Sequence, residues 1–411
     1  MHIAVLGAGV VGVTTAWYLA EAGHEVTVIE RENAVAQGCS FANGAQLSYS
    51  YMDAMANPAF LAKLPALLAG FDSAVRVRPQ INADLLRWGL AFINECTASK
   101  AAANTRVNLR LARRSQQLMG ELVPTLDMDF SHRSAGKIIL LASDKEMRAA
   151  ARNSKLKAEF GFRADVISLA EAIDIEPAIQ YMTGRYAGAV HSPGDDVGDS
   201  QAFTVALARQ LTDRPGCRLS LNTAIHEIIT ENGRVRAVDT SRGPIDVDAV
   251  VVCLGASSPR LLKPLGIDPG IYPVRGYSVT LRRGQHTNSV SVTDFSRRFV
   301  ISRIGEQVRI AGFADFVGFR TSKDAQRVAK LLHVAGAVAP CAADYQTSPN
   351  RAWGGFRPLT ANGRPLLGPT SVTGLYLNTG HGTLGWTLAC ASGEEVAQAV
   401  SGQPAASQLA A

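Results

Sequence analysis

The sequence lacks several features that would place it in other classes of protein. It contains no apolar run of about 18 residues, the length that a membrane-spanning helix needs. Its start reads as a strand, without the basic segment, apolar core and cleavage site of a secretion signal. The six cysteines are scattered, with no Cys-x-x-Cys pair or other metal-ligand spacing. We therefore expect a cytoplasmic protein with reduced thiols and no metal site.

Nucleic-acid binding is disfavoured as well, although the formal net charge is +6. Zinc-finger, RNA-recognition and helix-turn-helix patterns are all absent from the sequence. The most basic segment, residues 106–114 (RVNLRLARR), reads as the solvated face of a helix. The alternative is that this face touches anionic lipid, so peripheral contact with the inner face of the cytoplasmic membrane stays open.

The N-terminus contains a dinucleotide-binding fingerprint. An apolar strand leads into Gly7-x-Gly9-x-x-Gly12, a helical segment follows to Gly23, and a second strand ends at Glu30. The glycines permit a tight turn, close approach of backbone to a pyrophosphate, and close helix–strand packing. Glu30 stands where an acid accepts hydrogen bonds from a ribose, which disfavours the 2′-phosphate of NADP. The residues expected to contact the cofactor here are Gly7, Gly9, Val10, Val11, Gly12, Glu30 and Arg31.

The organisation of the rest of the chain favours FAD over NAD as the cofactor. Further β-α units normally follow the fingerprint directly in NAD enzymes. Here residues 59–126 are predominantly helical, and the sheet resumes only near residue 220, with 249–257 (AVVVCLGAS) as a late strand. Residues 272–316 alternate as the strands of a separate antiparallel sheet.

This pattern predicts an α/β fold with two interleaved domains, a Rossmann-like FAD-binding domain and an α+β substrate domain built on an antiparallel sheet. With 411 residues, the chain is long enough for two or three cores. The predicted FAD-binding domain comprises residues 1–58, 190–258 and 350–402, the substrate domain comprises 59–189 and 259–349, and 403–411 form a frayed tail.

Four segments together resemble the D-amino-acid oxidase superfamily. They are VLGAGVVGVTTAWYLAEAGHEVTVIERE near the start, VVVCLGASS, GGFRPLTANGRPLLG and LNTGHGTLGWT. Within that superfamily, the chain is most similar to the small, catalytic subunits of bacterial D-amino-acid dehydrogenases. The resemblance implies non-covalent FAD and oxidation of D-amino acids to 2-oxo acids and ammonia, with a quinone or another respiratory acceptor taking the electrons. The chain departs from those subunits at Gly38-Cys39-Ser40, Arg275 and Asp315.

Candidate substrate-binding residues carry alternative interpretations. Arg357 offers two parallel donors to a substrate carboxylate, and the resemblance implies this clamp; the alternative is a structural salt bridge. Tyr277 is expected to donate its hydroxyl near the substrate, unless it is a core tyrosine with a satisfied hydroxyl. His381 lies near the expected site but need only pack or orient. Arg303 points either into the pocket or to solvent.

A glycine-rich turn precedes the last predicted helix. Backbone N–H groups of Gly382, Thr383, Leu384 and Gly385 are expected to stabilise the negative charge that develops on the reduced flavin. A simple connector before a helix is the alternative. A further set is expected to line the flavin or its pyrophosphate: Asn43, Gly44, Gln46, Leu47, Ser48 and Gly255.

Other functions stay open at this point. One is an oxidase that reduces O₂, and another is a dehydrogenase for cyclic or N-methyl amino acids such as D-proline, D-hydroxyproline or sarcosine. A flavin-containing binding subunit without turnover belongs to a different class. The sequence does not indicate the oligomeric state.

Overall fold

The computed structural model describes residues 1–77, 82–125, 129–349 and 351–403, so most of the predicted tail lies outside the described residues. A six-stranded sheet has the order β19-β20-β13-β1-β2-β9. All neighbours in it are parallel except β19, which is antiparallel to β20. Its strands are β1 (His2–Leu6), β2 (Glu25–Ile29), β9 (Cys217–Ser220), β13 (Ala249–Val252), β19 (Leu366–Pro369) and β20 (Leu375–Thr379). This confirms the fingerprint strands and the predicted return of the sheet near residue 220.

The central strands of this sheet are covered on both faces, which explains their almost purely apolar sequences. Four helices share one continuous core on one face, and a small three-stranded sheet covers the other. The helices are α1 (Val10–Glu21), α4 (Ala98–Leu122), α7 (Ser200–Thr212) and α10 (Gly385–Val400). The small sheet contains β10 (Ile225–Glu231), β11 (Arg234–Thr240) and β12 (Ile245–Asp246), and α8 (Ser258–Leu262) packs beside it.

A nine-stranded, mainly antiparallel sheet forms the second half of the molecule. Its strands are β4 (Val75–Val77), β5 (Lys137–Leu141), β6 (Asp165–Ile167), β7 (Gly188–Ser192), β14 (Ile271–Arg282), β15 (Ser291–Asp294), β16 (Phe299–Ile304), β17 (Gln307–Phe316) and β18 (Arg351–Thr360). The antiparallel sheet predicted for residues 272–316 is therefore confirmed. The predicted domain boundaries stay a prediction, and we note that β18 pairs with β14 although residues 350–402 had been assigned to the FAD-binding domain.

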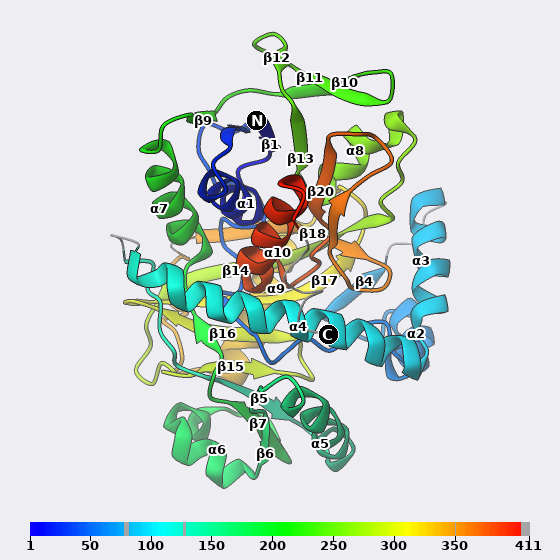
Figure 1. Ribbon diagram of the computed structural model, residues 1–411. Helices are drawn as coiled ribbons and strands as arrows, with labels where there is room; N and C mark the ends of the chain where they lie inside the picture. Colours follow the sequence, from blue (N-terminus) through cyan, green and yellow to red (C-terminus); the bar gives the residue numbers. More distant parts are fainter. Residues whose placement is uncertain (78–81, 126–128, 350, 404–411) are drawn as a thin grey trace.

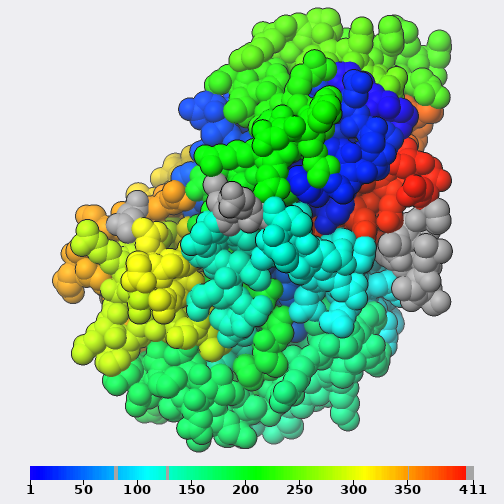
Figure 2. Space-filling view, turned by 60° about the vertical axis from the view of Figure 1, so that its left-hand side comes forward, coloured from blue at the N-terminus to red at the C-terminus, as the bar shows by residue number. Residues whose placement is uncertain are grey.

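Helices α2 (Pro58–Leu68), α3 (Ala83–Glu95) and α4 confirm the predicted helical region. Two further helices, α5 (Asp144–Ala158) and α6 (Leu169–Ile175), lie beyond β5–β7 at the end of the molecule opposite the β10–β12 sheet (Figure 1). The remaining helix, α9 (Asp324–Val338), packs on β14 and β17, and β3 (Gln46–Leu47) pairs with β8 (Asp196–Val197). Figure 2 shows the same two ends from another side. Over the described residues, no helix is both long and apolar enough to cross a membrane.

Candidate active site

The glycine fingerprint has the geometry that a bound pyrophosphate requires. Gly7 adopts φ +99°, a conformation that side chains other than hydrogen rarely allow. A Cβ atom on Gly12 would overlap the carbonyl oxygen of Gly7, so only glycine lets α1 approach the loop so closely. Gly9 caps α1 without a side-chain hydrogen bond. The N–H of Val10 donates to the hydroxyl of Ser40 at 2.9 Å, whereas the N–H groups of Val11 and Gly12 have no hydrogen-bond partner among the described residues and are left for an anion.

Glu30 lies directly against this loop. Its two carboxylate oxygens accept hydrogen bonds from the backbone N–H groups of Ala8 (2.8 Å) and Glu32 (3.1 Å). The carboxylate is thereby fixed at the end of β2, beside the expected position of a ribose. Arg31, in contrast, is exposed and pairs with Glu32 at 3.0 Å, so it points away from the loop.

The predicted flavin-lining segment connects the two halves of the molecule. The Asn43 side chain accepts a hydrogen bond from the N–H of Ala45, which holds the chain in a tight turn with Ala45 at φ +56°. Ser302 donates to the carbonyl of Gly44 at 3.0 Å. Leu47 is fully buried in the core shared by α1 and α10. This segment is thus held by both large sheets, and it passes between the fingerprint and β14–β17.

Lys137 is a buried residue of this region that the sequence analysis missed. Its ammonium group donates to the hydroxyl of Ser48 (2.9 Å) and to the amide oxygen of Gln46 (3.2 Å), and it lies 4.3 Å from the centre of the Tyr51 ring. No carboxylate oxygen lies within 4.0 Å of it in the part of the chain that the structure describes. Burial lowers the pKa of Lys137 to about 8. A single lysine at the head of an otherwise apolar strand, KIILL, was the available signal.

Strand β18 is the element on which the separate predictions converge. The thiol of Cys39 donates to the carbonyl of Phe356 at 2.7 Å. A Cβ atom on Gly255, in the turn after β13, would lie 3.8 Å from the Pro358 ring. The N–H of Gly382 donates to the carbonyl of Pro358 at 2.9 Å. Arg357 stands between these contacts, so the structure brings the cofactor-side turns and the predicted carboxylate clamp together.

The Arg357 guanidinium is held in place without an ionic partner. Its Nη1 donates to the carbonyl of Phe313 at 2.8 Å, and the group lies over Gly276 so closely that a Cβ there would overlap it. No carboxylate lies within 4.0 Å of it among the described residues, so the salt-bridge alternative is not realised. Burial lowers the pKa of Arg357, while Cys39 and Asp315 act in the opposite direction. A guanidinium in this state has donors left for a carboxylate ligand.

The strand opposite Arg357 is irregular. The pairing of β14 with β17 shifts between Arg275 and Tyr277, and Phe313 adopts φ +64°, which is rare for a bulky residue. Such bulges re-aim the groups around them and are frequent beside active sites. Here the bulge aims the Phe313 carbonyl at Arg357.

Tyr277 does not have the predicted position. It is fully buried, and its hydroxyl donates to Asp315 at 2.9 Å. Asp315 also binds Arg76 (2.9 Å) and Arg327 (2.7 Å). Because the one hydroxyl hydrogen is committed to this buried carboxylate, the geometry matches the alternative of a core tyrosine, and we do not retain Tyr277 as a substrate ligand.

His381 and Arg303 are also corrected. His381 is buried against α10, with its Nε2 3.1 Å from the hydroxyl of Ser392, and burial lowers its pKa to about 3. It is therefore a neutral packing residue. Arg303 donates to the carbonyl of Gly305 and lies 3.5 Å from Glu306, in the hairpin turn between β16 and β17. Its side chain turns to the surface, away from Arg357.

In the turn before α10, only some of the four backbone N–H groups expected to bind the flavin are free to donate. The N–H of Gly382 is bound by Pro358, and the N–H of Leu384 is bound by the carbonyl of His381 at 2.9 Å. The N–H groups of Thr383 and Gly385 have no hydrogen-bond partner among the described residues. Thr383 is exposed, and α10 begins without a side-chain cap. Two of the four expected donors thus remain available for a ligand.

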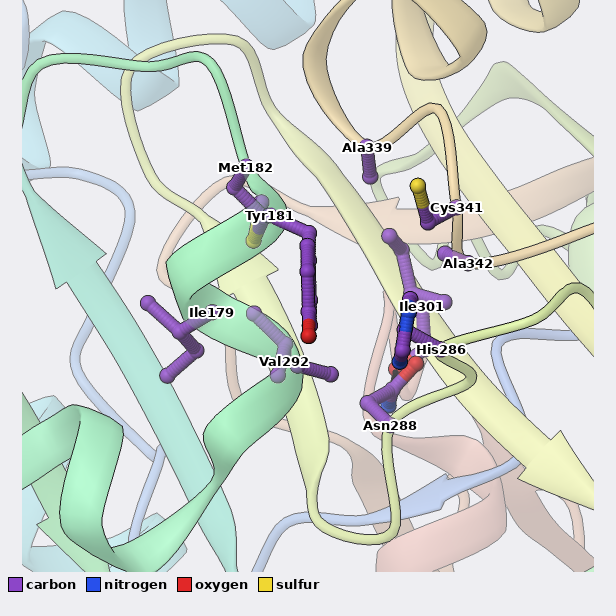
Figure 3. A pocket seen from close by; sticks show the side chains of 11 residues that line it. Ile179, Tyr181, Met182, His286, Asn288, Val292, Ile301, Ala339, Cys341 and Ala342 are labelled. Carbon is purple, nitrogen blue, oxygen red and sulfur yellow. Dashed lines mark hydrogen bonds between the residues drawn. The ribbon is translucent and has the colours of Figure 1, made fainter.

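One small pocket lies away from this region and does not suit an amino acid. It is bounded by Tyr181, which stacks on His286 with ring centres 3.8 Å apart, and by Asn288 and Cys341 (Figure 3). Its free volume is about 10 Å³, enough for a single water molecule. No group of three or more metal-ligating side chains occurs within the ranges that the structure describes.

Comparison with known proteins identifies the family of this arrangement. A family model described as FAD dependent oxidoreductase, DAO, matches residues 2–399. The chain belongs to the DAO family of FAD-dependent oxidoreductases. FAD is accordingly its cofactor, and the glycine loop, Glu30 and the α1 N-terminus fit the dinucleotide.

Several relatives within the DAO family are similar over nearly their whole length. "D-amino acid dehydrogenase 2" of Ralstonia nicotianae is 40% identical over 95% of this chain and 94% of its own. "D-amino acid dehydrogenase" of Paramagnetospirillum magneticum is 37% identical over 99% and 96%. The crystal structure of glycine oxidase from Geobacillus kaustophilus is similar with a TM-score of 0.76 and 23% identity, covering 98% of this chain and 95% of that one. The structural similarity confirms the α/β fold class.

Proposed function

We propose that this protein is an FAD-dependent D-amino-acid dehydrogenase, which converts D-amino acids to 2-oxo acids and ammonia. The observation that carries the proposal is Arg357, a half-buried guanidinium beside the cofactor-side turns with no carboxylate of the described chain paired to it. Relatives named D-amino acid dehydrogenase, 34–40% identical over nearly the whole chain, support the same conclusion.

In this proposal, the residues of the chain bind and orient the substrate. Arg357 holds the carboxylate, and Phe313 and Gly276 fix the direction of its guanidinium. Bound FAD supplies the acceptor for the hydride that leaves Cα. The backbone N–H groups of Thr383 and Gly385, which are free of partners in the described chain, would hold the cofactor and stabilise negative charge on it. The imino acid that is released hydrolyses in water.

No side chain at the site is required as a base. His381 is neutral and bound to Ser392, and the Tyr277 hydroxyl is bound to Asp315. Positioning and cofactor electrostatics would then supply most of the rate acceleration. We further propose that a membrane quinone or another respiratory acceptor takes the electrons, with the enzyme peripheral to the membrane; an oxidase that uses O₂ is the competing function.

The test is an anaerobic screen of D-amino acids, L-amino acids and cyclic or N-methyl amino acids for bleaching of the flavin absorbance. We expect rapid bleaching by D-amino acids and none by their L-enantiomers. Bleaching by the cyclic or N-methyl amino acids alone would mean that these, and not D-amino acids in general, are the substrates. Absence of bleaching by every compound would favour a flavin-containing binding subunit without turnover. Mixing the reduced enzyme with O₂ and, separately, with a soluble quinone then distinguishes an oxidase from a dehydrogenase.

A further inference from the structure

Exposed apolar side chains are concentrated on one pair of helices. Of the eleven large apolar residues exposed in the described parts of the chain, six lie between residues 61 and 93. They occupy α2, the turn after it, and α3, which lie together at one side of the molecule (Figure 1). We call them the helix-pair patch: Leu61, Leu68, Phe71, Leu86, Leu90 and Ile93.

The patch is not needed to hold these helices on the protein. Their inner faces are already packed, with the Phe92 ring 5.1 Å from both Phe60 and Trp88 and with Leu67 buried. A helix at the surface of a globular protein normally carries polar residues on its outer face. Instead, Leu86, Leu90 and Ile93 follow one another at helical spacing on the outside of α3. Both helices are thus apolar on two sides. An exposed apolar side of this kind is typical of a surface that binds a second apolar partner.

That partner is either a lipid bilayer or a second copy of this chain, and the charges on the two helices distinguish between them. Residues 58–71 contain a single charged residue, Lys63, which is exposed, and no carboxylate. Helix α3 carries two carboxylates, and each has a lysine partner: Asp84 lies 2.8 Å from Lys263, and Glu95 lies 3.2 Å from Lys100. Phe71, at the turn after α2, is 85% exposed. On α2 and the turn after it, leucines and an aromatic tip with one lysine and no acid are the composition of a segment that lies in the headgroup region of an anionic bilayer.

The patch is structurally continuous with the proposed active site. The indole N–H of Trp88 donates to the carbonyl of Leu359 at 2.9 Å, two residues beyond Arg357. Strand β4, between α2 and α3, pairs with β17 at Ala314, next to the Phe313 carbonyl that binds Arg357. If this patch bound a lipid bilayer, strands β4, β17 and β18 would lie close to the membrane surface.

The basic face of α4 is a weaker candidate for membrane contact than its sequence suggested. Arg114 forms two hydrogen bonds to the carboxylate of Glu394. Arg106 lies 3.8 Å from Glu159, and Arg113 donates to Gln116 at 3.0 Å. Two of its four arginines, Arg106 and Arg114, therefore already have carboxylate partners within the protein, whereas the partner of Arg113 is neutral.

We propose that the helix-pair patch binds the surface of an anionic lipid bilayer. Leu68, Phe71, Leu86 and Leu90 enter the boundary between headgroups and acyl chains, and Lys63 reaches up to the lipid phosphates. The proposal deepens the proposed function, on which its biological meaning rests, because a membrane quinone would then be reached through this face.

The test is flotation of the flavin-loaded protein with vesicles of phosphatidylcholine and phosphatidylglycerol. We expect the wild type to float and L68S/F71S/L86S/L90S to lose vesicle affinity by about 100-fold, because four apolar side chains no longer leave water. The control I175S/F295S removes two exposed apolar residues elsewhere and should float like the wild type. R106Q/R110Q, on α4, should float as well.

Several outcomes would overturn the proposal. They are failure of the wild type to float, flotation of the patch variant with unchanged affinity, and loss of flotation in R106Q/R110Q alone. A wild-type dimer that the patch substitutions convert to monomer, seen by sedimentation without vesicles, would assign the patch to a second copy of this chain. Dye-linked oxidation of D-amino acids without vesicles checks each variant's fold. That activity is measured independently of flotation. Its absence from the wild type and from every variant would refute the proposed function without changing the conclusion about lipid binding.

Discussion

At the scale of single residues, the proposed site depends on space left empty by glycine. Gly276 lies beneath the Arg357 guanidinium, and Gly354 lies in the same way beneath Arg275. Arg275 itself pairs with Asp324 and stacks on the Phe356 ring at 4.2 Å, so it is already committed. Of these two neighbouring arginines, only Arg357 has no carboxylate partner among the described residues.

Substitution of Gly276 by alanine should displace Arg357, because the new Cβ would overlap the guanidinium. We expect KM for D-amino acids to rise about tenfold to 100-fold, with flavin content unchanged. Steady-state kinetics with a dye acceptor checks this. Gly120→Ala is the matched control, since a Cβ there meets nothing within 4 Å. An unchanged KM in G276A would show that the guanidinium position is not critical.

Lys137 should give the folding stability a pH dependence of known sign. Burial lowers the pKa of Lys137 to about 8 in the folded state, whereas in the unfolded chain it is about 10.4. The unfolded state therefore binds more protons between these values, and the folded state gains stability as pH rises through this window. We expect Tm of the wild type to rise from pH 8 to pH 10 relative to K137M. A constant difference across that range would mean that Lys137 stays protonated.

At the scale of elements, the fingerprint loop is the most sensitive part of the cofactor site. Alanine at Gly12 would place a Cβ against the carbonyl of Gly7 and push α1 away from β1. We expect G12A to be purified with little or no flavin, as measured by the ratio of absorbance at 450 and 280 nm, with 450 nm approximately the flavin maximum. Retention of stoichiometric FAD in G12A would contradict the assigned binding mode, and G120A again serves as control.

Local sequence patterns predicted the helices and strands well, but they predicted the hydrogen-bond partners of individual side chains less well. The β-α-β start and the helices before residue 126 follow from periodicity and end signals, and both are present. The roles of Tyr277 and Arg303 could not be read in the same way. Asp315, which binds the Tyr277 hydroxyl, is brought there by the pairing of β14 with β17, and pairing partners are not encoded in a local pattern. The partners of Arg303, Gly305 and Glu306, are local, but the hairpin turn that joins them was not predicted.

At the scale of the whole molecule, β18 explains how two sheets make one site. It pairs along its length with β14 of the larger sheet, while Pro358 and Leu359 touch the turn before α10 of the nucleotide half. Three positions at which the chain departs from the dehydrogenases it resembles, Cys39, Arg275 and Asp315, all lie around Arg357. Differences in substrate range between relatives should therefore map to this junction.

The central claim is that Arg357 holds the carboxylate of a D-amino acid for oxidation by the bound flavin. The most direct measurement is anaerobic stopped-flow reduction of the flavin in the wild type and R357A, by a D-amino acid and by the corresponding amine without its carboxylate. We predict that R357A needs about 100-fold more D-amino acid or more for half-maximal reduction, and that the two proteins treat the amine alike. Equal saturation of both proteins by the D-amino acid would contradict the account.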